Sequence, residues 1–190
     1  MIAYVKSNFL LVPIVVLLLF VVSSYAKFST KVTTSEIRGI CTHRNVNASF
    51  CYEFMKSSPQ IATLDISDLA KFLINYDFQK TLDLMKHFQS LTNSTTDRSS
   101  KESYKICSEL FSLGIHLLES SLKALATNDY DTLDRNVSDM SAYAEECGSE
   151  LSSVIKPIPQ LLKGVSIVEN VGHIVLVILE CFLVKEKTFC

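Results

Sequence analysis

The sequence predicts an all-α protein: an antiparallel four-helix bundle with a short N-terminal helical hairpin extension, stapled by disulfides. Apolar residues recur at alternating steps of three and four along the segments that follow the N-terminal region, which places each set on one face of a helix. With five Gly and four Pro among 190 residues, the chain lacks the tight turns of an all-β fold. A hydrophobic content of 48% excludes a disordered or collagen-like chain.

The N-terminal segment predicts a secretory signal peptide over residues 1–26. Lys6 is its only charged residue, and residues 9–22 form an apolar run. Ser24 and Ala26 fit the small-residue positions before a signal cleavage site. A transmembrane anchor needs about 20 apolar residues, and this run is shorter. We therefore expect secretion of a mature chain.

The mature chain, residues 27–190, is expected to form one domain. An extension at about 31–60 precedes a bundle at about 61–185. The extension carries two short helical pieces, near 35–40 and 50–57. The four bundle helices are expected, in order, over 66–91, 104–125, 133–151 and 161–182.

The connections between these helices have typical loop compositions. A polar loop is expected over 92–100, a tight turn at Asn128-Asp129, and a break at Pro157 and Pro159. Short loops between long amphipathic helices imply antiparallel neighbours. The nearly all-apolar stretch from 174 to 184 has eleven residues, too few to span a bilayer, and is expected to be a core helix.

The spacing of two cysteines favours a disulfide between the second and third bundle helices. Cys107 lies 21 residues before Asn128 and Cys147 lies 19 residues after it. In an antiparallel hairpin the two lie within about 3 Å of the same level, at a rise of ~1.5 Å per residue. Both also lie on the inward stripes. Secretion places them in an oxidising compartment, where cysteines form disulfides.

The other four cysteines are less constrained by spacing, since six cysteines allow 15 full pairings. Cys41 and Cys51 lie ten residues apart across a predicted turn, where a bridge would pin the extension. Cys181 is expected to be a free core thiol, because no partner lies level with it. Cys190 is not assigned.

Neither a catalytic centre nor a metal or cofactor site is expected. The sequence has no Gly-rich phosphate loop, no Gly-x-Ser-x-Gly and no His-Glu-x-x-His. It lacks Cys-x-x-Cys, and its four histidines are scattered. The net charge of −2 indicates no attraction to nucleic acid or to a membrane surface. Three sequons predict glycosylation at Asn47, Asn93 and Asn136.

The ordered cysteines and their flanking residues resemble the plant invertase and pectin methylesterase inhibitor family. The match covers roughly 35–184 and is closer to the pectin methylesterase inhibitors. It rests on five stretches: Ile40-Cys41-Thr42, Phe50-Cys51, Tyr104-Lys105-Ile106-Cys107-Ser108-Glu109, Asp129-Tyr130-Asp131-Thr132-Leu133 and Ile174-Val175-Leu176-Val177-Ile178.

The resemblance implies a secreted, non-catalytic protein of the plant cell wall. Such a protein would bind one pectin methylesterase molecule in a 1:1 complex, cover its active-site cleft with one side of the bundle and limit pectin demethylesterification. The resemblance also implies two disulfides, between the first and second and between the third and fourth cysteines.

The resemblance also indicates partner-binding residues and keeps the target enzyme open. Glu109 matches an acidic position on the third-cysteine helix, whereas Leu113 and His116 stand where acids are expected. Tyr130-Asp131-Thr132 replaces the Pro-Lys-Phe triplet of the invertase inhibitors, and Gly148-Ser149 replaces an acidic pair.

The candidates for partner binding are therefore Glu109, His116, Tyr130 and Asp131. A pectin methylesterase is the favoured target. Acid invertase, or a wall or signalling role without inhibition, remains the alternative. If His116 faces the partner, its protonation in mild acid would make affinity depend on pH.

Overall fold

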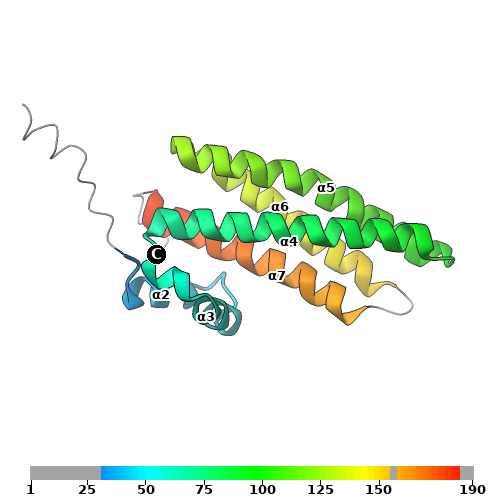
Figure 1. Ribbon diagram of the computed structural model, residues 1–190, viewed down its shortest axis with the longest axis horizontal. Helices are drawn as coiled ribbons and strands as arrows, with labels where there is room; N and C mark the ends of the chain where they lie inside the picture. Colours follow the sequence, from blue (N-terminus) through cyan, green and yellow to red (C-terminus); the bar gives the residue numbers. More distant parts are fainter. Residues whose placement is uncertain (1–30, 155–157, 185–190) are drawn as a thin grey trace, which may run out of the picture. The chain divides into compact units, whose positions relative to one another are not determined.

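Helices make up almost all of the regular structure in the computed structural model, which describes residues 31–154 and 158–184 (Figure 1). The predicted signal peptide, Pro157 and Cys190 lie outside the described residues. In the described part the α-helices, in order, are α2 (Thr34–Cys41), α3 (Ala48–Ser57), α4 (Ile66–Ser94), α5 (Arg98–Thr127), α6 (Tyr130–Ser152) and α7 (Pro159–Ile178). A 3-10 turn covers Pro59–Thr63, and a π-helical turn continues α7 over Leu179–Leu183.

The four long helices form the predicted bundle, so the predicted fold class is confirmed. α4 packs against α5, α5 against α6, α6 against α7, and α7 back against α4. The short connections make successive helices antiparallel, and Figure 1 shows them side by side. α5 and α7 therefore lie diagonally across the core, as do α4 and α6. The short helices α2 and α3 form the extension.

Aspartates begin three of the four bundle helices. Asp65, Asp97 and Asp129 are the N-caps of α4, α5 and α6, and the carboxylate of each accepts a hydrogen bond from the backbone N–H three residues on. The hydrogen bonds from Ser100 lower the pKa of Asp97. Because each of these helices begins directly after its cap residue, the connections stay short. Short connections between long helices make successive helices antiparallel.

The predicted polar loop over 92–100 is wrong for most of its length. α4 continues to Ser94 and α5 already begins at Arg98, which leaves three residues between them. The hydroxyls of Thr92 and Ser94 donate to the carbonyl oxygens of Phe88 and Ser90, at 2.9 Å each. Because these polar side chains bond to the preceding turn, they are compatible with a helix end.

The core consists of the inward stripes of all four helices. Phe88 of α4 and Phe111 of α5 meet edge to face, with ring centroids 5.6 Å apart. Gly114 lets α5 approach α6, because a Cβ there would collide with the sulfur of Met140. The segment Pro159–Leu183 is long and apolar enough to cross a membrane by length and composition alone. In this fold it packs between α4 and α6, which explains its apolar character.

Two disulfides staple the described chain. Cys107 is bonded to Cys147, with their Cα atoms 4.9 Å apart, and this bridge joins α5 to α6. Cys41 is bonded to Cys51 and joins α2 to α3. The predicted free thiol at Cys181 is wrong, because this cysteine is disulfide-bonded. Cys181 is half-buried in the turn after α7, and comparing levels along the bundle helices did not reveal its bond.

A carboxyl group lies inside this core. Asp77 of α4 is 2% exposed, and its Oδ1 has no hydrogen-bond partner among the described residues. Thr81, one turn further along α4, also has a buried hydroxyl without a partner. Burial raises the pKa of Asp77 well above the ordinary carboxyl value. The folded protein therefore favours the neutral form of this acid.

Removing both cysteines of the bridge between α5 and α6, as Cys107→Ala with Cys147→Ala, should lower the free energy of unfolding by about 4 kcal/mol. The loop closed by this bridge spans 40 residues, and chain entropy gives about that amount. For the ten-residue loop of Cys41 and Cys51 the same relation gives about 2.7 kcal/mol. Denaturant unfolding of the two double variants measures both losses. Equal losses of unfolding free energy, or a larger loss for the shorter loop, would contradict this account.

The buried acid should make stability fall as the pH rises. The unfolded chain releases the Asp77 proton near the ordinary carboxyl value, whereas the folded chain holds it up to a higher pH. This group's contribution is therefore fully present in acid and is lost as the pH rises towards its folded pKa. Asp77→Asn, which keeps the shape and stays neutral, should flatten that slope. Unfolding measured from acidic to neutral pH tests the difference between the two proteins.

Candidate partner-binding face

The outer surface of α5 carries two of the predicted partner-binding residues. Glu109 and His116 lie seven residues apart, or two helical turns, and both are exposed. Glu109 lies 3.9 Å from Lys105, and His116 Nδ1 lies 3.9 Å from Glu119 Oε2. Each of these side chains is at least half exposed, so the pairs hold the residues only weakly. Both remain available to a partner.

The first turn of α6, directly after the connection from α5, carries the other two. Asn128 has a left-handed backbone, with φ of 56°, and ends α5. Tyr130 donates its hydroxyl to Asn128 Oδ1 at 3.0 Å, while Asp129 accepts from the Thr132 N–H at 3.2 Å. The hydrogen bonds from Thr132 lower the pKa of Asp129. The turn is thus ordered, with Asp131 exposed beside it.

These four residues do not form one cluster. His116 lies 11 residues before the end of α5 at Thr127, or about 16 Å along the helix axis. Glu109 lies two turns further away. Tyr130 and Asp131 therefore mark one end of the bundle, whereas Glu109 and His116 lie near the middle of α5.

A second apolar stripe on α5 borders α6, and sequence reasoning missed it. Its apolar members follow steps of three and four and are half-buried or exposed: Ile106, Leu110, Leu113 and Leu117. Ser103 donates its hydroxyl to Glu150 Oε2 of α6 at 3.3 Å, which shows that this flank of α5 meets α6. The alternating spacing of this second stripe is present in the sequence, but only the core stripe was predicted from it.

The matching flank of α6 is acidic. Glu150 contacts α5 through Ser103. Residues at steps of four and three along the same flank share its orientation: Asp139, Tyr143, Glu146 and Glu150. We call these two stripes together the α5–α6 face. It has an apolar side on α5 and an acidic side on α6, which suits it to binding a protein surface.

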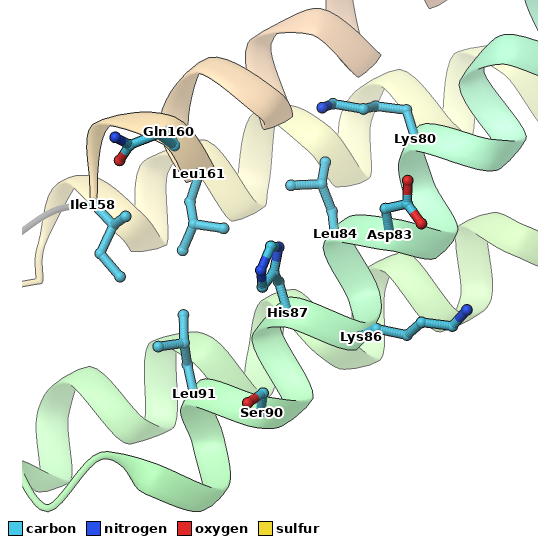
Figure 2. Close-up of a pocket in the computed structure, with 10 residues that line it drawn as sticks. All are labelled: Lys80, Asp83, Leu84, Lys86, His87, Ser90, Leu91, Ile158, Gln160 and Leu161. Atoms are coloured by element: carbon cyan, nitrogen blue, oxygen red, sulfur yellow. The ribbon is translucent and has the colours of Figure 1, made fainter.

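A hollow lies elsewhere in the described chain, between α4 and the start of α7. It measures about 700 Å³. Figure 2 shows His87 in its centre, among Leu84, Leu91, Leu161 and Ile158. No group of three His, Cys, Asp or Glu in the described residues could hold a metal ion. The hollow has no arrangement that we can assign to a reaction.

The three predicted glycosylation sites differ in accessibility. Asn47 and Asn93 are exposed, and Asn47 caps α3 through its Oδ1, which leaves its nitrogen available. Asn136 of α6 is 8% exposed, and its Nδ2, the atom that would carry a glycan, is buried without a partner. The predicted glycan on Asn136 is incompatible with this fold, because the inward face of α6 has no room for a sugar.

Comparison with known proteins gives related sequences and structures. Residues 35–178 match the family described as "Plant invertase/pectin methylesterase inhibitor". The chain is 28% identical over 172 residues to the pectinesterase inhibitor of Actinidia deliciosa, covering 90% of this chain and 92% of the relative. It is 27% identical over 150 residues to pectinesterase inhibitor 2 of Arabidopsis thaliana, covering 79% and 86%.

A solved structure shares the fold. The crystal structure of mutant form A of a pectin methylesterase inhibitor from Arabidopsis superposes with a TM-score of 0.71 at 24% identity. The superposition covers 76% of this chain and 95% of the other. The family match spans most of the chain, including both disulfides within the described residues. The chain belongs to the plant invertase/pectin methylesterase inhibitor family, a family of inhibitors and not of enzymes.

Proposed function

We propose that this protein is secreted into the plant cell wall, binds one pectin methylesterase molecule and covers its active-site cleft. The observation that carries the proposal is the likeness to relatives named as pectinesterase inhibitors, which spans 90%, 79% and 94% of the chain for three of them. The proposed 1:1 complex would limit pectin demethylesterification. Residues 1–26, as a signal peptide, would direct the chain to the cell exterior.

The α5–α6 face is the surface that we assign to this binding. Glu109 and His116 border it on α5, and the acidic stripe borders it on α6. The disulfide between Cys107 and Cys147 joins the two helices beneath the face, so little order has to be gained when a partner binds. A rigid surface of this kind inhibits by obstruction and needs no catalytic group of its own.

Acid invertase is the alternative target, since the family name covers both enzymes. The turn at Tyr130-Asp131-Thr132 argues against it. In this chain the turn is an aspartate-capped helix start, and it lacks the Pro-Lys-Phe triplet that the resemblance associates with invertase inhibitors. A bundle without inhibitory activity is the second alternative, because Leu113, His116, Gly148 and Ser149 replace expected acids.

Titration of the purified mature protein against one pectin methylesterase and one acid invertase should separate these alternatives. We expect saturable loss of esterase activity with an equivalence point near one inhibitor per enzyme, and unchanged invertase activity. Methanol release from pectin and sucrose cleavage are the two readouts. Invertase inhibition alone would select the other target. Inhibition of neither enzyme, at both acidic and neutral pH, would indicate a bundle that has lost the inhibitory function.

A further inference from the structure

Leu113 is the one large hydrophobic side chain in the described residues that is exposed, with 54% of its surface accessible to solvent. It lies on the α5 stripe of the α5–α6 face, with Leu110 and Leu117 half-buried one turn before and after it. A single exposed leucine on a protein surface is common. This one differs because it continues a stripe of partly exposed apolar residues.

Charged groups surround this apolar stripe on both sides. Glu109 lies one turn before Leu113 on α5, and Asp139, Glu146 and Glu150 lie along α6. The basic groups are fewer. Lys105 on α5 lies within 4 Å of Glu102 and Glu109, and Arg135 lies nearer the start of α6. The face thus has an apolar centre and a mainly acidic border.

We infer that Leu113 is the apolar anchor of the α5–α6 face and inserts into an apolar depression on the target enzyme that is bordered by basic side chains. This inference rests on the proposed function. Protein interfaces concentrate their binding energy in a few central, well-packed side chains, enclosed by neighbouring groups that exclude water. Leu113 and the acids around it have this arrangement.

A second copy of this chain fits the face less well than a basic partner. A twofold contact would place the acidic stripe of one copy beside that of the other, and like charges repel. Complementary charge therefore favours an enzyme surface with basic residues. Leu113 would contribute to binding through burial of apolar area, and salt does not screen that contribution. Salt does screen the attraction between the acidic border and a basic partner.

The test compares three substitutions at Leu113 with one matched control. Leu113→Ala removes the anchor, Leu113→Asn keeps its size and makes it polar, and Leu113→Met keeps it apolar. Leu162→Ala makes the same truncation at a half-buried leucine of α7, diagonally across the bundle from α5. Thermal unfolding of each variant checks that the bundle is intact, and titration calorimetry against a pectin methylesterase measures Kd.

We expect Leu113→Ala and Leu113→Asn to raise Kd at least tenfold, at low and at high salt alike, with thermal unfolding unchanged. Leu113→Met and Leu162→Ala should bind as the wild type does. If Leu113→Ala binds the esterase like the wild type, the anchor is wrong and the proposed function survives. If the wild type binds no esterase, both are wrong. A wild-type dimer that Leu113→Ala dissociates, with esterase binding unchanged, would assign the face to self-association and overturn the anchor.

Discussion

The covalent link between α5 and α6 is the constraint on which the rest of the structure depends. Cys107 and Cys147 lie at the same level of two antiparallel helices, and their bond fixes the register of those helices far from the turn that joins them. With the register set, Ser103 meets Glu150, and Gly114 admits Met140. The relative placement of the two stripes of the α5–α6 face is therefore a consequence of where two cysteines stand in the sequence.

The protein has exceptions of both kinds to the rule that apolar side chains are buried and polar ones exposed. Asp77 and Asn136 are polar and buried, whereas Leu113 is apolar and exposed. A buried carboxyl with an unpartnered oxygen costs stability, and burial raises its pKa, which favours the neutral form and reduces that cost. An exposed leucine costs little in the free protein and gains free energy only when a partner covers it. The first departure links stability to pH, and the second is suited to binding.

Much of the fold could be predicted from the sequence because the core stripes repeat over many turns. The level positions of Cys107 and Cys147 followed from counting residues on either side of Asn128, since the rise per residue of a helix is constant. Residue counting along the helices did not predict features that depend on individual side-chain contacts. The run at 92–100 is mostly helical, and at the end of α4 the hydroxyls of Thr92 and Ser94 bond back to the preceding turn. Asn136 belongs to the core face of α6, which its sequon gave no means of judging.

The candidate site was predicted only in part, for a related reason. Glu109 was found because it matches an acidic family position, and His116 because it stands where the family has an acid; the structure places both on the outside of α5. The acidic stripe of α6 was missed, because its nearness to Leu113 depends on which flank of each helix meets the other. Only a contact between the helices, such as that of Ser103 with Glu150, decides this.

Leu113 and His116 stand where the family resemblance leads us to expect acids. This difference suggests how inhibitors with the same helix bundle could differ in the enzyme that they bind. Acidic residues at the centre of a binding face attract a basic partner at long range, but they must be desolvated when they are buried. A leucine at the centre needs no such compensation and gains from burial, while acids at the border still guide encounter. The bundle can thus keep its charge complementarity and move its specificity to shape, because an apolar anchor binds only where the partner provides a depression to receive it.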